Sequence, residues 1–95
     1  MAAYVILDLH IFDKEQLAEY KSIASKIIDE FRGEIIVRGG KTKIVQGNCK
    51  PERMVIIKFD SYEIANNFWN SEAYQKAIAL RKKGAETNAI IIDGV

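Results

Sequence analysis

The sequence of 95 residues predicts an α+β fold in which four strands form an antiparallel sheet and two helices cover one face of it. Segments rich in β-branched residues alternate along the chain with segments whose apolar residues recur every three or four positions. Residues that favour helix caps stand at the boundaries between these segments. A hydrophobic fraction of 48% with a single proline is typical of a folded chain and not of a disordered one.

The chain opens with an expected strand and helix. Residues 4–12 are rich in β-formers and partly alternate between the two faces of a strand. Asp13 stands where a helix N-cap is needed, with Gln16 three residues later in a variant of the capping box. Apolar residues then recur at helical spacing from Leu17 to Phe31, and Gly33 is well placed to end the helix.

A short second strand, EIIVR, is expected at residues 34–38. The pair Gly39-Gly40 that follows is either a two-residue hairpin turn or a bulge that bends one longer strand through residues 41–47. The sequence leaves both alternatives open. Residues 47–51 read as a loop, because the residue before Pro51 favours an extended backbone.

The second half repeats the pattern of strand, helix and strand. Residues 53–59 form an expected strand with a continuous apolar middle, and Ser61 is a good N-cap for the helix after it. Asn70-Ser71 offers a second cap, which predicts a break in this helix before it resumes and ends at Gly84. Residues 87–93 form the last expected strand.

The resulting order βαββαβ, with right-handed crossovers, predicts a single ferredoxin-like domain over residues 1–95. Two helices can cover only one face of its sheet, so the other face should be polar in a monomer. Residues 35–37, 54–57 and 89–92 are instead apolar on both sides of their strands. A second copy packed on the helix-free face would bury that surface, so the sequence predicts a two-fold homodimer.

Composition limits the classes of partner and compartment. Fourteen basic and thirteen acidic residues give a net charge of +1, so no nucleic-acid partner is expected. The apolar runs are too short to span a membrane, and the N-terminal segment lacks the basic leader of a signal peptide. Cys49 is the only cysteine, which excludes an internal disulfide. A cytoplasmic location is therefore expected.

Residues spread over nearly the whole chain are similar in kind and spacing to one known family. They are Tyr20, Val37-Arg38-Gly39-Gly40, Gly47, Pro51, Arg53, Phe59, Ser61, Ala65, Trp69, Ser71, Tyr74, Arg81 and Gly94. On these residues the chain resembles the domain of unknown function family 1330. The resemblance implies a dimeric α+β barrel but no function; antibiotic-biosynthesis and haem-degrading monooxygenases are relatives at the level of fold. The stretch 32–34 departs from the family, which more often has two glycines there.

Four residues are candidates for binding a ligand. Arg38 and Arg81 each carry a guanidinium that can hold a carboxylate or a phosphate through two parallel hydrogen bonds, or that can instead form a salt bridge within the protein. Trp69 and Tyr74 flank the expected helix break and could line an aromatic cleft between the second helix and the sheet. Alternatively they pack in the core, as aromatic residues at helical spacing usually do. Tyr20 could close the same cleft or belong to the core.

Catalytic chemistry has one candidate, His10, which shares a strand face with Asp8 and could act as an acid or base. It could equally be a histidine satisfied by hydrogen bonds. A lone histidine argues against a metal site, and no cofactor is expected. Nothing near Cys49 would activate it as a nucleophile.

The leading functional hypothesis is a small homodimeric protein with a pocket for a small anionic or aromatic organic molecule. One alternative is a cofactor-free enzyme, like a monooxygenase or isomerase by analogy of fold, that uses His10 with Arg38 or Arg81. The other is a purely structural or interaction dimer. The sequence does not decide whether the protein is an enzyme.

Overall fold

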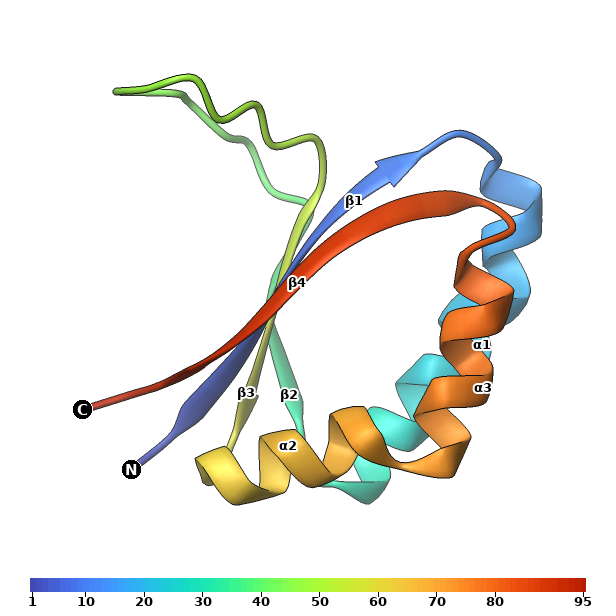
Figure 1. Ribbon diagram of the computed structural model, residues 1–95, viewed down its shortest axis with the longest axis vertical. Coiled ribbons are helices and arrows are strands. Elements are labelled where there is room, and N and C mark those ends of the chain that lie inside the picture. The colour runs from blue at the N-terminus through green and yellow to red at the C-terminus, as the bar shows by residue number, and fades with distance from the viewer.

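The computed structural model describes residues 1–95 and contains four strands and three helices (Figure 1). In chain order they are β1 (Ala3–Ile11), α1 (Lys14–Glu30), β2 (Glu34–Arg38), β3 (Met54–Phe59), α2 (Tyr62–Asn70), α3 (Glu72–Arg81) and β4 (Ala85–Asp93). The order is the predicted βαββαβ, with the second helix divided into α2 and α3.

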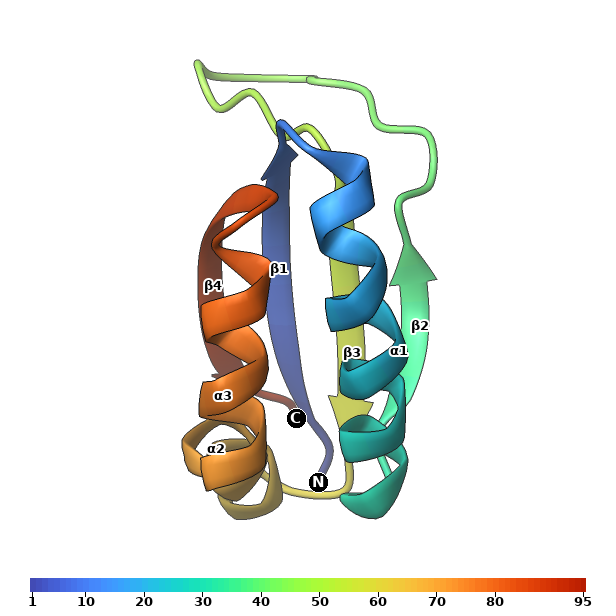
Figure 2. The same ribbon diagram turned by 90° about the vertical axis from the view of Figure 1, so that its right-hand side faces the viewer.

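The four strands form one sheet in the order β2-β3-β1-β4, and every neighbouring pair is antiparallel. All helices lie on the same face of this sheet, with α1 over the β3 side and α3 over the β4 side (Figure 2). This arrangement confirms the ferredoxin-like α+β fold. None of the helices is both long enough and apolar enough to cross a bilayer.

The core lies between the sheet and the helices. On β1, the alternate residues Ala3, Val5, Leu7 and Leu9 are buried on the helix side, as the period of a strand requires. Phe59 of β3, Phe68 of α2 and Tyr74 of α3 stack on one another beside them, with ring centroids 4.8 and 4.3 Å apart. Burial of these large rings holds the broken second helix against the sheet.

Two predicted caps form at the start of the helices. Asp13 caps α1, since its carboxylate accepts hydrogen bonds from the backbone N–H groups of Glu15 (3.1 Å) and Gln16 (3.3 Å). Ser61 caps α2 by accepting a hydrogen bond from the N–H of Ile64 at 3.1 Å. Both confirm the sequence prediction.

The predicted break at Asn70-Ser71 is also confirmed. Ser71 has an extended backbone between α2 and α3, and its hydroxyl bonds both helix ends. Its Oγ accepts from the N–H of Tyr74 at 3.2 Å and donates to the carbonyl of Phe68 at 2.8 Å. One side chain therefore ends one helix and starts the next.

The end of α1 differs from the prediction. The left-handed residue is Arg32, with φ of 57°, and not Gly33. Gly33 is needed for a different reason, because a Cβ there would lie 2.7 Å from Cγ2 of Ile28 and 2.8 Å from Cε1 of Phe59. Its small size, and not its conformational freedom, lets the chain turn tightly against the core.

Gly39-Gly40 is neither a hairpin turn nor a strand bulge. It begins a loop that continues to Arg53 and extends away from the sheet (Figure 1). The register of β2 against β3 shifts instead between Ile35 and Val37. The predicted continuation of a strand through residues 41–47 is therefore wrong. The last strand is longer than predicted, because Ala85 already pairs with Ile11.

The helix-free face of the sheet is apolar at its centre. Ile6 of β1 pairs with Ile56 of β3 on one side and with Ile90 of β4 on the other. Ile90 is 58% exposed and its neighbour on the same face, Ile92, is 49% exposed. The sheet thus presents a strip of branched aliphatic side chains to solvent, as the sequence predicts.

Candidate ligand-binding site

A cavity of about 520 Å³ lies between α1 and the part of the sheet formed by β1, β3 and β2. Nine of its fourteen lining residues are hydrophobic, and the sheet supplies its floor through Leu7, Leu9, Val55 and Ile57. The helix side carries small residues over this floor, namely Ser22, Ala24 and Ser25. The same helix also contributes Leu17, Tyr20, Lys21 and Ile28 to the lining.

Two guanidinium groups border the cavity. Arg38 is the last residue of β2 and Arg53 directly precedes β3. Because the two strands are antiparallel, with Arg38 opposite Val55, both cations lie at the same end of the sheet. Neither side chain forms a salt bridge or a hydrogen bond within the protein, so both remain free for a ligand.

Local backbone geometry holds Arg53 in place. Its carbonyl accepts from the N–H of Leu9 at 2.9 Å, and its own N–H donates to Oδ1 of Asp8 at 3.3 Å. Its guanidinium lies across Gly39, where a Cβ would be only 2.6 Å from Nη1. Gly39 also has a left-handed backbone, with φ of 61°. The backbone conformation at this position favours glycine, and any larger residue would also push the guanidinium of Arg53 aside.

Another guanidinium, that of Arg81, is buried among aromatic rings. It is 5% exposed, and its Cζ lies 5.5 Å from the ring centroid of Tyr20 and 5.7 Å from that of Trp69. Its Nη1 donates to the hydroxyl of Tyr74 at 2.9 Å, whereas its Nε has no partner. No carboxylate pairs with this guanidinium, so the salt bridge considered from the sequence does not form.

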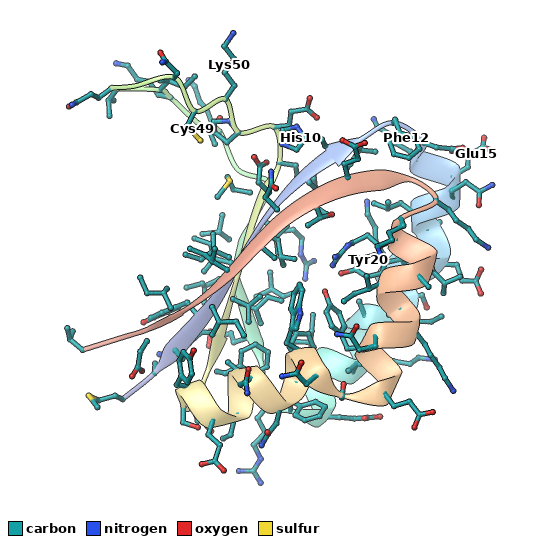
Figure 3. The ribbon with its side chains drawn as sticks, in the orientation of Figure 1. His10, Phe12, Glu15, Tyr20, Cys49 and Lys50 are labelled. Carbon is teal, nitrogen blue, oxygen red and sulfur yellow. The ribbon has the colours of Figure 1, made fainter.

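Tyr74 and Tyr20 connect this cluster to the cavity. Their hydroxyl oxygens lie 2.9 Å apart. Burial raises the pKa of Tyr74 well above the ordinary value of a tyrosine, and the neighbouring Tyr20 adds to this, while Arg81 acts in the opposite direction. Tyr20 projects from α1 into the space between the helices and the sheet (Figure 3), and it also lines the cavity.

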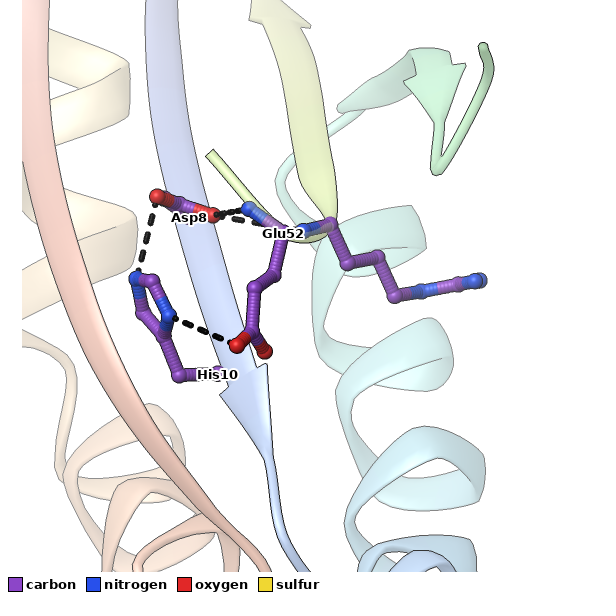
Figure 4. Close-up of polar contacts among 4 residues, drawn as sticks. Asp8, His10 and Glu52 are labelled. Atoms are coloured by element: carbon purple, nitrogen blue, oxygen red, sulfur yellow. Dashed lines mark hydrogen bonds and ion pairs between the residues drawn. The ribbon is translucent and has the colours of Figure 1, made fainter. Parts of the chain in front are cut away.

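His10 lies on the other face of the sheet. Its Nε2 is 3.1 Å from Oδ2 of Asp8 and its Nδ1 is 3.4 Å from Oε1 of Glu52 (Figure 4). Partial removal from water lowers the pKa of His10, but the hydrogen bond that its imidazole donates to Glu52 and the charges of both carboxylates outweigh this effect, so the pKa is raised overall. The β1 residues that line the cavity, Leu7 and Leu9, point to the opposite side of the strand.

The candidate residues therefore divide into three groups. Arg38 borders the cavity; Tyr74 and Arg81 are buried behind Tyr20, with the half-buried Trp69 beside them; and His10 is separated from both groups by the sheet. Arg53 and Lys21 are cationic residues of the cavity lining that were not among the predicted candidates, and of these Arg53 lies at the same end of the sheet as Arg38. Its place directly before a strand antiparallel to the one that ends at Arg38 is the signal that could have found it.

No group of three or more His, Cys, Asp or Glu side chains is placed to hold a metal ion. Cys49 is exposed on the loop between β2 and β3, as Figure 3 shows. The arrangement as a whole offers cations and hydroxyl groups around an apolar space. It suits the recognition of an organic anion better than the coordination of a metal.

Comparison with known proteins identifies a family and a fold. The family model described as "Domain of unknown function (DUF1330)" matches residues 2–95. No curated protein matches the sequence.

Solved structures of similar fold share little sequence with this chain. A protein of unknown function from Rhodopseudomonas palustris is 11% identical, with a TM-score of 0.77 over 99% of this chain and 82% of that one. A dimeric ferredoxin-like protein of unknown function from Jannaschia is 8% identical, with a TM-score of 0.69 over 99% of this chain and 100% of the other. A candidate antibiotic biosynthesis monooxygenase from Caulobacter crescentus is 11% identical, with a TM-score of 0.62 and coverages of 99% and 90%. At such identities the likeness extends to the fold alone.

Proposed function

This chain belongs to the DUF1330 family of domains of unknown function, and we propose that it binds a small organic anion in the cavity beneath α1. The observation that carries the proposal is an apolar cavity bordered by two guanidinium groups that have no partner in the protein. The apolar floor accommodates the body of the ligand, while Arg38 and Arg53 bind its carboxylate.

Size and charge both support this class of ligand. A cavity of about 520 Å³ lies within the range that small-molecule sites usually have. Two like charges at one end of the sheet repel each other, and a bound carboxylate would relieve that repulsion. An aromatic or branched aliphatic acid would satisfy both the floor and the cations.

The proposed assembly is a homodimer formed through the helix-free face of the sheet. Ile6, Ile56 and Ile90 form an apolar centre on that face, and the exposed Ile92 extends it along β4. Packing the same face of a second copy against it would form a self-complementary, two-fold interface. Solved proteins of this fold from Jannaschia and Thermobifida fusca are described as dimeric, which also supports the proposal.

The enzymatic alternative based on His10 receives no support from the geometry. An acid or base must reach the proton that it transfers, and His10 lies across the sheet from the cavity. The fold shared with a candidate monooxygenase does not transfer an activity to this chain.

A ligand screen tests the binding proposal. Benzoate and phenylacetate are expected to raise the melting temperature of the wild type, whereas benzamide and phenylacetamide, which lack the negative charge, are not. Arg38→Met and Arg53→Met keep most of the side-chain length and should each weaken carboxylate binding by about tenfold or more. Arg32→Met is the control, because Arg32 lies at the distant end of α1. Equal binding of acids and amides would contradict the proposal.

Gly39→Ala provides a test of the position of Arg53. The added methyl group would meet the guanidinium and would also be strained at a positive φ, so it should displace Arg53 and weaken carboxylate binding severalfold. Gly40→Ala is the matched control, since a Cβ at Gly40 has no atom within 4 Å. Isothermal titration calorimetry of both variants, with the carboxylate that binds the wild type most tightly, compares their affinities. Equal affinities would mean that Arg53 does not need its place over Gly39.

A further inference from the structure

A guanidinium without a counter-ion is unusual inside a protein. Arg81 is buried, makes a single hydrogen bond, and faces the rings of Tyr20 and Trp69 in place of a carboxylate. Removing an unpaired charge from water is costly, and aromatic rings offset only part of that cost. The positive charge therefore lacks the full compensation that a negatively charged group would give it.

The directions of the hydrogen bonds in this cluster follow from the donors. A guanidinium can only donate, so the bond of 2.9 Å from Arg81 makes the hydroxyl oxygen of Tyr74 an acceptor. Tyr74 is fully buried, and the hydroxyl oxygen of Tyr20 is its only other partner. Because a buried O–H group that donates to nothing is unfavourable, Tyr74 donates its proton to Tyr20.

This direction leaves the hydroxyl proton of Tyr20 without an acceptor in the protein. Tyr20 already accepts from Tyr74, and it makes no other side-chain hydrogen bond. It also lines the cavity beneath α1. An acceptor for this proton has to be supplied from outside the chain, and the cavity is where a bound molecule could supply it.

We propose that Tyr20 donates a hydrogen bond to an oxygen atom of the ligand in this cavity, and that Tyr74 and Arg81 are positioning residues that fix and polarise this donor. The hydrogen bonds from Arg81 to Tyr74 and from Tyr74 to Tyr20 point the same way, so each strengthens the next. Through these two hydrogen bonds, the buried positive charge of Arg81 makes the hydroxyl of Tyr20 a stronger donor. It would stabilise a ligand oxygen that carries partial or full negative charge.

This inference rests on the proposed function and narrows its ligand class. The molecule would carry a carboxylate, bound by Arg38 and Arg53, and a second oxygen acceptor such as a ketone, bound by Tyr20. Keto acids and aromatic acids with a carbonyl substituent have both groups. A simple hydrocarbon acid has only the first.

Two ligands of similar shape separate the contributions of the carboxylate and of the second oxygen. 4-Acetylbenzoate carries a ketone oxygen at the position where 4-isopropylbenzoate carries a methyl group. The wild type should bind the ketone about fivefold more tightly, as is typical of one additional hydrogen bond. Infrared spectroscopy should show the ketone stretch at lower frequency in the complex than in water.

Three variants assign these effects. Tyr20→Phe should bind the two ligands equally and lose the infrared shift. Tyr74→Phe retains the donor but removes its support, so the infrared shift should become smaller. Tyr62→Phe, on the exposed surface of α2, should match the wild type in both measurements. An unchanged infrared shift in Tyr74→Phe would overturn the positioning role.

The outcomes distinguish this inference from the function on which it rests. Equal affinity for both ligands in the wild type and no infrared shift, with both ligands still weakened by Arg38→Met, would overturn the role of Tyr20 alone. No binding of either ligand would overturn both proposals. Folding of each variant is checked first by circular dichroism, and Tyr20→Phe and Tyr74→Phe keep the aromatic packing that holds the cluster together.

Discussion

Arg32 occupies a left-handed backbone conformation at the end of α1, with φ of 57°. A side chain with a Cβ is strained there, whereas glycine is not. Arg32→Gly should therefore raise the free energy of unfolding by about 0.5–1 kcal/mol, as measured by urea denaturation. Arg32→Ala removes the same charge but keeps the strain, so it should change stability little. A destabilised glycine variant would show that the side chain of Arg32 makes a favourable contact.

His10 predicts a pH dependence of stability whose direction can be worked out. Asp8 and Glu52 raise its pKa in the folded protein above the ordinary 6.5, and Glu86 faces it from β4. Folding therefore favours the protonated imidazole. This stabilisation is fully present below about pH 6.5 and is lost as the pH rises through the higher folded pKa.

The His10→Gln variant isolates this effect. The difference in unfolding free energy between wild type and variant should shrink as the pH rises from about 5.5 to about 8.5. Urea denaturation at several pH values and one protein concentration measures it. A difference that grows with pH would mean that the neutral imidazole is the favoured form.

Ser71 caps the end of α2 and the start of α3, so replacing it should destabilise both helices. Ser71→Ala removes the acceptor for the N–H of Tyr74 and the donor to the carbonyl of Phe68. The free energy of unfolding should fall by about 1 kcal/mol, and hydrogen exchange of the Tyr74 amide should accelerate. Ser71→Thr keeps the hydroxyl and should retain most of the stability. If hydrogen exchange of the Tyr74 amide were unchanged in Ser71→Ala, packing alone would be sufficient to maintain the break between α2 and α3.

The elements themselves could be predicted because their signals are local. Asp13, Ser61 and Ser71 cap helices where the sequence indicates, and the apolar alternation of residues 4–12 gives the first strand. The segment 41–47 resembles a strand in sequence but has no neighbouring strand to pair with. The pairing of β2 with β3 ends where Arg38 lies opposite Val55. A strand depends on its partner, and the sequence of one segment does not show whether a partner is present.

The site was less accessible to sequence analysis than the fold. Arg38 could be proposed from its place beside two glycines, and it borders the cavity. The cavity itself lies between α1 and three strands, so it depends on how α1 packs against the sheet, which no single segment of the sequence shows. The pairing of Tyr20 with Tyr74 joins residues 54 positions apart and has no local pattern.

At the scale of the whole molecule, the proposed dimer depends on the helix-free face of the sheet. Ile90→Glu would place a charge at the centre of the proposed interface, so we expect light scattering to show a dimer for the wild type and a monomer for the variant. Tyr62→Glu is the control, because Tyr62 is a comparably exposed residue, 48%, on the helical side of the protein. A monomeric wild type at micromolar concentration would contradict the proposed dimer.

The loop between β2 and β3 is held by hydrogen bonds where it joins the sheet, and its middle is exposed to solvent. The N–H of Gly39 donates to the carbonyl of Met54 at 2.7 Å, and Asp8 accepts from the N–H of Glu52 at 3.0 Å. The two arginines of the cavity flank this base, while the middle of the loop extends into solvent. Insertions, deletions or grafted peptides in the middle should thus leave anion recognition intact. The outer segment of the loop could therefore vary in length and sequence without disturbing the proposed site.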